Sequence, residues 1–328
     1  MNAAGPIGVL GGGAWGTALA QVLAEGGSDV LLWARNGAVV EAINTRRQNE
    51  TYLPGQPLSP RIRATQAPGD LAGAGALLVV TPSQSMRAVL SQFAPQGQSL
   101  ILCSKGIEAG SHLLMHEVAR EVMPGSPVAV LSGPTFAHEV AAGLPTAVTL
   151  AAEEEALARL LADVIARPTF RPYVSDDVVG AEIGGAVKNV LAIACGVVEG
   201  AGLGQNARAA LIARGFAEMT RFGLARGGRP ETMAGLSGLG DLVLTCSSTR
   251  SRNYALGYGL GQGQSPDALL AHRHTVAEGA STAPVLHEAA RAQGIDMPVT
   301  EAVCALLSGA SRVDDVIAAL LARPLRAE

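Results

Sequence analysis

The 328-residue sequence has few aromatic side chains and few charges. Aromatic residues make up 3% and charged residues 16% of the chain, whereas hydrophobic residues make up 48%. This composition excludes an intrinsically disordered chain and, with the length, indicates a folded protein of about two domains. The net charge of -4 supplies no basic field for nucleic acid, so we expect no nucleic-acid partner. An anionic ligand would have to be held by a few local cations and backbone N–H groups.

Paired cysteines and long apolar runs are also missing. The four cysteines, Cys103, Cys195, Cys246 and Cys304, form no CxxC pair and lie among apolar or small residues. Free, buried thiols in a reducing cytoplasm are the simplest interpretation. No basic segment precedes the first apolar run, as it would in a signal peptide, and no run has the length and character of a membrane span. We therefore predict a cytoplasmic protein that does not span a membrane.

The pattern of apolar segments predicts two domains of different class. Apolar runs without alternation, as expected for strands covered on both faces, recur at 6–10, 29–35, 75–82, 99–104 and 127–134. The segments 146–151 and 170–175 look like later strands. Helical patterns between them predict βαβ units. From about residue 175 the pattern is helical, with the longest candidate at 176–199. We predict an α/β Rossmann-like domain with a doubly wound parallel sheet over 1–174, followed by an all-α domain over 175–328.

The glycines near the N-terminus stand in the register G-x-G-x-x-G. Gly11, Gly13 and Gly16 follow a predicted strand and open a predicted helix, which is the context that gives this pattern meaning. The first glycine permits a tight turn, the second lets a pyrophosphate approach, and the third packs helix on strand. The N–H groups of the helix N-terminus can then bind the phosphates. This arrangement predicts dinucleotide binding rather than a plain glycine turn.

The residue that would distinguish NAD from NADP is expected about 20 positions later. At that place the sequence reads Trp33, Ala34, Arg35 and Asn36, with no acidic residue for a ribose hydroxyl. The charge and planar fork of an arginine suit a 2′-phosphate. We predict that NADP(H) is used at least as well as NAD(H). The alternative, that Arg35 is a solvated residue at a strand end, stays open.

Six further segments combine glycine with polar or charged residues. They are CSKGIE (103–108), LSGPTFAHEV (131–140), GAVKNVLAIACG (185–196), GLSGLGDLVLTC (235–246), STRSRNYALG (248–257) and TVAEGAST (275–282). In this order and spacing they resemble the bacterial glycerol-3-phosphate dehydrogenases that use NAD(P), over nearly the whole chain. The resemblance implies reversible hydride transfer between a nicotinamide cofactor and C2 of glycerol 3-phosphate or dihydroxyacetone phosphate. It also implies a role in supplying phospholipid synthesis.

The resemblance and the residue chemistry together assign candidate site residues. Lys188 matches the family's catalytic lysine, the proton acceptor in the oxidation direction. The substrate-binding candidates are Lys105, Gly133, Thr135, Lys188, Asn189, Asp241, Ser251, Arg252 and Asn253. The cofactor-binding candidates are Gly11, Gly13, Ala14, Trp15, Gly16, Arg35, Lys105, Ala137, Arg252, Val276 and Glu278. Ala14 stands where the family often has serine, and its backbone N–H can serve there.

General chemistry agrees with the role given to Lys188. Only two of the 24 Lys and Arg residues are lysines, Lys105 and Lys188. Carbonyl reduction needs an acid/base near the oxygen, and a lysine can release its proton when burial lowers its pKa, whereas an arginine cannot. Gly184, Gly185 and Ala192, about one turn from Lys188, are expected to leave room for a substrate. Asp241 could orient the lysine or a substrate hydroxyl, and Arg252, just before a predicted helix, suits a phosphate.

Plainer interpretations of the same residues stay open. Lys188 could be a helix-edge lysine that reaches solvent, Asp241 a helix cap, and Lys105 a surface charge. His112 and His116 have i, i+4 spacing, but no third ligand is evident, so we expect no metal. The competing functions are a related hydroxyacid dehydrogenase and an inactive NAD(P)-binding module. A homodimer is compatible with the helical domain, although no segment defines an interface.

Overall fold

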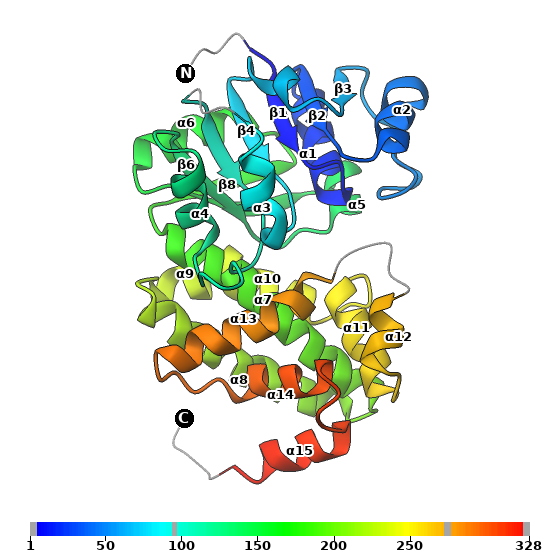
Figure 1. Cartoon of the computed structure of the whole chain (residues 1–328), viewed down its shortest axis with the longest axis vertical. Helices are drawn as coiled ribbons and strands as arrows, with labels where there is room; N and C mark the ends of the chain where they lie inside the picture. Colours follow the sequence, from blue (N-terminus) through cyan, green and yellow to red (C-terminus); the bar gives the residue numbers. More distant parts are fainter. Residues whose placement is uncertain (1–4, 94–96, 272–276, 324–328) are drawn as a thin grey trace. The chain divides into compact units, whose positions relative to one another are not determined.

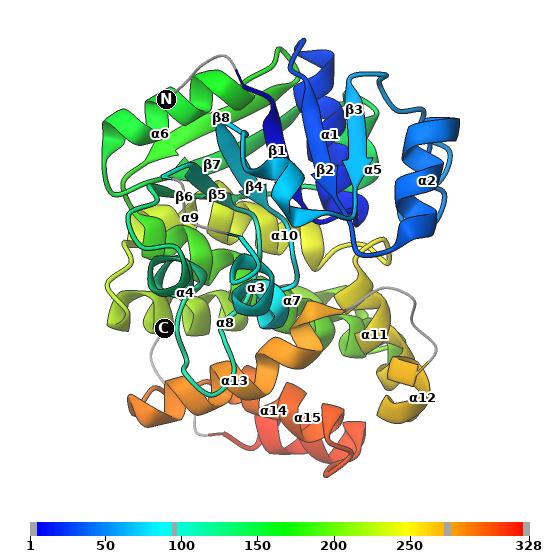
Figure 2. The same ribbon diagram turned by 45° about the horizontal axis from the view of Figure 1, so that its top comes forward.

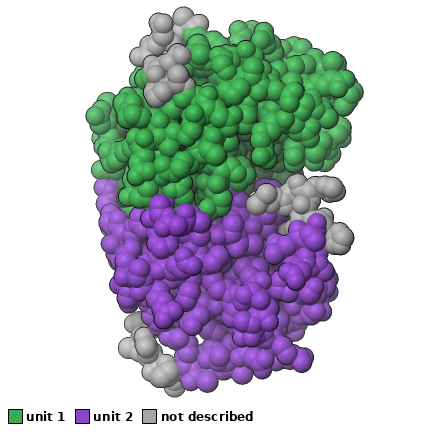
Figure 3. Space-filling view, in the orientation of Figure 1, with its two compact units in different colours: residues 1–108, 113–182 green, residues 109–112, 183–328 purple. Residues whose placement is uncertain are grey.

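The computed structural model describes residues 5–93, 97–271 and 277–323, which divide into two compact units. Unit 1 consists of residues 1–108 and 113–182, and unit 2 of residues 109–112 and 183–328 (Figure 3). The long helix α7 (Val178–Gly200) begins in unit 1 and continues in unit 2.

Unit 1 is built on an eight-stranded sheet with the order β3-β2-β1-β4-β5-β6-β7-β8 (Figure 2). The strands are β1 (Ile7–Leu10), β2 (Val30–Trp33), β3 (Ile62–Thr65), β4 (Ala76–Val79), β5 (Ser99–Leu102), β6 (Val128–Ser132), β7 (Thr146–Ala151) and β8 (Phe170–Ser175). Neighbouring strands are parallel, except that β6 and β7 are antiparallel. The strand order reverses between β1 and β4. In such sheets ligands bind beyond the carboxyl ends of the strands at this point.

Helices cover both faces of this sheet (Figure 1). One apolar cluster joins the sheet to α1 (Ala14–Glu25), α2 (Gly37–Arg46), α5 (Ala137–Ala141) and α6 (Glu155–Ile165). A second joins it to the 3₁₀ helix η1 (Pro68–Leu71), α3 (Ser83–Leu90), α4 (Met115–Val122) and the start of α7. The apolar strands are therefore buried from both sides. This confirms the predicted fold class, a doubly wound α/β sheet followed by helices.

Two features of the sheet differ from the prediction. The sequence analysis misses β3, because its four residues include the exposed Arg63 and form no continuous apolar run. A fully parallel sheet is also wrong at β7. Helix α5, with five residues, rises only about 7.5 Å, whereas β6, also with five residues, is about 16 Å long. Such a short helix does not carry the chain back to the end of the sheet where β6 begins. Strand β7 therefore starts beside the end of β6 and runs antiparallel to it.

Unit 2 is helical in its described residues. After α7 follow α8 (Gly204–Ala225), α9 (Pro230–Ala234), the π-helical turn η2 (Leu236–Gly240), α10 (Asp241–Thr245), α11 (Arg252–Gly261), α12 (Pro266–Ala271), α13 (Glu278–Ala292), α14 (Pro298–Leu307) and α15 (Val313–Leu321). Helix α7 is long and apolar enough to cross a membrane, but 94% of its most apolar window is buried inside the protein. It is therefore a core helix.

Glycines let helix α11 approach α7 backbone to backbone. A Cβ atom at Gly196 would lie 2.1 Å from the carbonyl oxygen of Tyr254. A Cβ atom at Gly257, on the other helix, would lie 1.9 Å from the carbonyl oxygen of Ile193. Real Cβ atoms do not come this close to another atom, so any side chain at these positions would push the two helices apart.

Gly184 serves the same kind of contact with the turn η2. A Cβ atom at Gly184 would lie 2.4 Å from the carbonyl oxygen of Ser237 and 2.9 Å from Cα of Gly238. The space beside Gly184 is thus filled by backbone. The prediction that this glycine leaves room for a substrate is wrong; it admits the turn that leads to Asp241.

The cysteines are free thiols in the described part of the chain, three of them buried and Cys304 half-buried. Burial raises the pKa of Cys103 to about 12 and that of Cys304 to about 11. A hydrogen bond with Cys195, together with burial, raises the pKa of Cys246 well above its usual value. These three thiols stay protonated at neutral pH, which makes them poor nucleophiles.

Candidate functional site

The glycine loop connects β1 to α1 in unit 1. Gly11 has a φ of +132°, which favours glycine, and a Cβ atom there would lie 2.6 Å from the carbonyl oxygen of Val80. A Cβ atom at Gly16 would lie 1.9 Å from the carbonyl oxygen of Gly11. The loop therefore contacts both the chain beyond β4 and the first turn of α1 through backbone atoms. Gly11 and Gly16 are needed by the fold itself.

Gly13 has a different environment. Its φ of -74° is open to any residue, and a Cβ atom there would meet no heavy atom of the described residues within 4 Å. No described side chain caps the N-terminus of α1, which leaves first-turn N–H groups available to an anion. A side chain at Gly13 would fill this open cradle. The loop thus fits the pyrophosphate of a dinucleotide.

The remaining predicted cofactor positions of unit 1 follow the carboxyl ends of strands. Ala14 and Trp15 begin α1, and the indole Nε1 of Trp15 is buried without a hydrogen-bond partner among the described residues. Arg35 is exposed just after β2, and its carbonyl oxygen accepts a hydrogen bond of 2.9 Å from Gln66 Nε2. Ala137 is the first residue of α5. The exposed guanidinium of Arg35 is compatible with either interpretation of this residue.

Three predicted substrate positions come together beyond β5 and β6. The Nζ atom of Lys105, which is half-buried, donates to the carbonyl oxygen of Gly133 at 3.4 Å. The hydroxyl of Thr135 donates to the same oxygen, also at 3.4 Å. Gly133 has a φ of +149°, and a Cβ atom there would lie 3.0 Å from Cα of Val148. Lys105 is therefore part of a cluster at the carboxyl ends of β5 and β6 rather than an isolated surface charge.

Lys188 forms a buried polar cluster in unit 2. The residue is 6% exposed, and its Nζ atom donates to Asp241 Oδ1 at 2.5 Å and to Thr245 Oγ1 at 3.1 Å. Asp241 is fully buried at the start of α10, and Thr245 donates to the same Oδ1 at 3.2 Å. The carboxylate compensates the charge of the ammonium, as a buried charge requires. Lys188 is thus no solvent-reaching edge lysine, and the carboxylate of Asp241 binds it rather than capping α10.

The sequence analysis misses Thr245 as a member of this cluster. Its position four residues after Asp241 is the signal that could have found it. Residues at i and i+4 share one face of a helix, so a hydroxyl there can reach the same ligand as the acid. The sequence does not show that α10 starts at Asp241, because the preceding π-helical turn hides the helix register.

A second buried polar chain joins α7, α11 and α13. The Nδ2 atom of Asn253 donates to Asn189 Oδ1 at 2.9 Å, and the backbone N–H of Gly279 donates to Asn253 Oδ1 at 2.9 Å. The hydroxyl of Ser251 caps α11 by accepting from the N–H of Tyr254 at 3.3 Å. Of these predicted substrate residues, Asn189 and Asn253 orient each other, and Ser251 caps its own helix.

The other candidates of unit 2 lie at helix starts. Arg252 is exposed and begins α11, and Glu278 is half-buried and begins α13. The predicted cofactor residue Val276 lies outside the described residues. These positions bring Arg252 next to the Ser251 cap and Glu278 next to Gly279.

The two histidines with i, i+4 spacing have separate carboxylate partners. His112 Nε2 lies 3.3 Å from Glu288 Oε2, whereas His116 Nδ1 lies 2.6 Å from the buried Glu182 Oε2. Burial opposes the charged form of His116, but the hydrogen bond and charge of Glu182 outweigh it and raise the pKa. Among the described residues, no group of three His, Cys, Asp or Glu side chains is placed to hold a metal ion.

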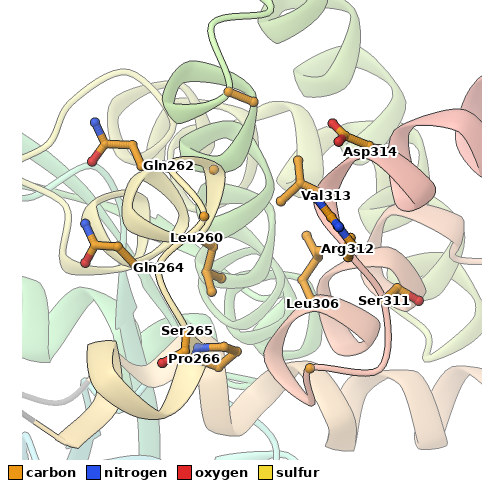
Figure 4. A pocket seen from close by; sticks show the side chains of 14 residues that line it. Leu260, Gln262, Gln264, Ser265, Pro266, Leu306, Ser311, Arg312, Val313 and Asp314 are labelled. Atoms are coloured by element: carbon orange, nitrogen blue, oxygen red, sulfur yellow. The ribbon is translucent and has the colours of Figure 1, made fainter.

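Unit 2 also contains a pocket of about 550 Å³ (Figure 4). It lies between the chain that joins α11 to α12 and the chain that joins α14 to α15. Its lining residues are Ala201, 260–266, Leu306, Gly309 and 311–314. None of the predicted site residues that the structure describes lines this pocket, so it forms no part of the candidate site.

Comparison with known proteins gives matches along the whole chain. The model of the NAD-dependent glycerol-3-phosphate dehydrogenase N-terminus matches residues 6–158, and that of the C-terminus matches residues 177–318. Proteins from Sphingopyxis alaskensis and Novosphingobium aromaticivorans, both named glycerol-3-phosphate dehydrogenase (NAD(P)+), are each 63% identical over 98% of this chain and 98% of their own. A crystal structure of glycerol-3-phosphate dehydrogenase from Coxiella burnetii has a TM-score of 0.93 at 39% identity and covers 97% of this chain and 99% of that one.

Alanine at Gly13 and at Gly16 should separate dinucleotide binding from folding. We expect Gly13→Ala to leave the Tm unchanged and to raise the Kd for NADPH about tenfold or more, because the new methyl group enters only the open cradle. Gly16→Ala should lower the Tm, because its methyl group meets the Gly11 carbonyl oxygen. Thermal unfolding and fluorescence titration with NADPH measure both. Equal losses of Tm in the two variants would contradict this division.

Proposed function

The chain belongs to the NAD-dependent glycerol-3-phosphate dehydrogenase family, and from this premise we propose that it interconverts sn-glycerol 3-phosphate and dihydroxyacetone phosphate with NAD(P)(H). The observation that carries the proposal is the family match over both units. In the reduction direction, dihydroxyacetone phosphate, NAD(P)H and one proton give glycerol 3-phosphate and NAD(P)+. The enzyme is thus an oxidoreductase that must bind a dinucleotide and a phosphorylated three-carbon substrate, and must move one proton.

The dinucleotide-binding part of the proposal rests on the loop between β1 and α1. Gly11, Gly13 and Gly16 and the N–H groups of Ala14 and Trp15 would hold the pyrophosphate. The bound nicotinamide supplies or accepts the hydride at C2 of the substrate. Further cofactor contacts are proposed at Arg35, Lys105, Ala137, Arg252, Val276 and Glu278. We assign the dinucleotide-binding domain to residues 1–174, to which Arg252, Val276 and Glu278 would add contacts from the rest of the chain.

We assign the proton transfer to Nζ of Lys188. In the reduction direction Nζ gives a proton to the oxygen on C2, and in the oxidation direction it takes that proton back. Asp241 and Thr245 hold Nζ in one position through the hydrogen bonds described above. Holding the proton donor in place lowers the activation free energy, because the entropic cost of bringing the donor to the oxygen no longer arises during the reaction. Residues 175–328 would form this catalytic domain.

The phosphate of the substrate is assigned to Arg252, with support from Ser251 and Asn253. A guanidinium binds two phosphate oxygens at once, and the start of α11 adds backbone N–H groups. Lys105, Gly133, Thr135 and Asn189 complete the proposed set of substrate contacts. The product glycerol 3-phosphate would serve phospholipid synthesis. We place the enzyme in the cytoplasm, and a homodimer is compatible with its helical domain.

Oxidation of NADPH on addition of dihydroxyacetone phosphate tests the proposed activity directly. We expect turnover with dihydroxyacetone phosphate and a much lower kcat/KM with dihydroxyacetone, which lacks the phosphate that Arg252 would bind. Absorbance at the NADPH band measures both. Equal efficiency with the two substrates would favour a hydroxyacid dehydrogenase, and NADPH binding without any turnover would favour an inactive binding module.

Substitution of Lys188 tests the assignment of the proton transfer. Lys188→Ala should lower kcat by about 100-fold or more, the scale expected for the loss of a positioned acid/base. Lys188→Arg should be similarly inactive, although it keeps the positive charge beside Asp241, because an arginine does not release its proton. The Kd for NADPH serves as the control for folding and should change little. A kcat near the wild-type value in either variant would assign the proton transfer to another group.

Substitution of Arg35 tests the choice of coenzyme. Arg35→Ala should lower the ratio of kcat/KM for NADPH to that for NADH by about tenfold, because it removes the cation that would face the 2′-phosphate. Arg159→Ala, at another exposed arginine in unit 1, is the matched control and should leave the ratio unchanged. If the ratio is the same in wild type and Arg35→Ala, Arg35 is only a solvated residue at a strand end.

A further inference from the structure

The side chain of Asn49 forms hydrogen bonds with the glycine loop and with the helix that follows it. Asn49 lies after α2 and is 1% exposed. Its Nδ2 atom donates to the carbonyl oxygen of Gly12 at 3.0 Å and to Thr17 Oγ1 at 2.7 Å. Gly12 belongs to the loop, whereas Thr17 lies in the first turn of α1 and its N–H donates to the carbonyl oxygen of Gly13. A single nitrogen therefore ties the loop to the helix that it opens.

Asn49 is itself held in place by its own backbone. Its carbonyl oxygen accepts hydrogen bonds from the N–H groups of Tyr52 at 3.2 Å and Leu53 at 2.7 Å, in a short turn closed by a β-bridge between Asn49 and Leu53. Gly12 is confined on its other side, because a Cβ atom there would lie 2.6 Å from Cβ of Ala34. The amide and the loop thus meet in a position that neither can easily leave.

The chemistry of this contact requires a group with two N–H bonds. Both partners, the Gly12 carbonyl and the Thr17 hydroxyl, present oxygen atoms to the same point, and a side-chain amide nitrogen can donate to both. The amide oxygen of the same side chain, Asn49 Oδ1, is buried and accepts no hydrogen bond among the described residues. An unpaired buried oxygen costs stability. The side chain of Asn49 is therefore placed for the two hydrogen bonds that its NH₂ group donates, not for its oxygen.

The consequence for the dinucleotide follows from the geometry of the peptide bond. In a trans peptide the carbonyl of one residue and the N–H of the next point in opposite directions. Holding the Gly12 carbonyl on Asn49 therefore fixes the direction of the Gly13 N–H, at the residue that faces the open cradle. A rotated peptide would instead present a carbonyl oxygen to the phosphates, and two negative partners repel.

We propose that Asn49 is a positioning residue for the dinucleotide, which keeps the Gly12–Gly13 peptide turned with its N–H toward the pyrophosphate. Asn49 acts only through Gly12 and Thr17. This inference rests on the proposed function in one respect, namely that the glycine loop binds NAD(P)(H). It is independent of the identity of the substrate.

The variant Asn49→Asp tests the inference, because it keeps the shape of the side chain and removes both N–H donors. We expect the Kd and the KM for NADPH to rise about tenfold or more, while kcat at saturating NADPH and the KM for dihydroxyacetone phosphate stay within about twofold. Thr17→Val removes one of the two acceptors and should raise the Kd for NADPH by a smaller factor. It also decides the question if Asn49→Asp does not fold.

Asn44→Asp is the matched control. The amide of Asn44 also joins two segments of unit 1, because it bonds the backbone N–H and carbonyl of Ala64 at 2.8 Å and 2.9 Å, but neither of these bonds involves the glycine loop. We expect this variant to lower the Tm and to leave the Kd for NADPH within about twofold of wild type. A purely structural Asn49 would behave in the same way, with a lower Tm and an unchanged Kd, and that result would overturn the inference.

The Kd is measured with NADPH alone, so the outcome does not depend on the substrate. If the wild-type protein binds NADPH but does not reduce dihydroxyacetone phosphate, the proposed activity fails, and a raised Kd in Asn49→Asp still supports the role of Asn49. If the wild-type protein is active and Asn49→Asp binds NADPH normally, the proposed activity stands and the inference about Asn49 is wrong. A wild-type protein that binds neither NADPH nor NADH would overturn both.

Discussion

Contact between backbones at glycine is the constraint on which both units depend. In unit 1, Gly16 allows α1 to begin against the carbonyl oxygen of Gly11, and in unit 2, Gly196 and Gly257 allow α7 and α11 to pack without side chains between them. Glycine loses more conformational freedom on folding than any other residue, so each such contact carries an entropic cost. That cost is offset where the contact brings functional groups within reach of one another.

The Lys188 cluster shows what this packing achieves. Gly184 admits the η2 turn against α7, and that turn delivers Asp241 to the ammonium one helical turn further along α7. A buried ion pair is poor evidence for stability, because taking two charges out of water costs about as much as their attraction returns. Its value here is positional. A lysine held by a carboxylate and a hydroxyl presents its proton in one place, as the proposed reaction requires.

Much of the fold could be predicted from local pattern, and the exceptions have physical causes. Strands β1, β2, β4, β5 and β6 are visible as continuous apolar runs because both faces of the sheet are covered there. Strand β3 is hidden because it has only four residues and the exposed Arg63 interrupts its apolar character. The direction of β7 depends on the length of α5, which apolar pattern does not encode. In the site, the motifs point to Lys188 and Asp241, but the position of Thr245 depends on where the π-helical turn ends and α10 begins.

The order of motifs along the chain was enough to recognise the family resemblance and to predict the dinucleotide loop and a role for Lys188. These depend on residue types at short spacings, where helix and strand geometry constrain neighbours directly. Packing alone could show that Gly184 contacts backbone instead of substrate, and that Asn49 binds a loop 37 residues earlier in the chain. Such contacts join segments whose approach is set by the whole fold. No local pattern specifies them, because a buried amide or glycine looks the same in sequence whichever neighbour it meets.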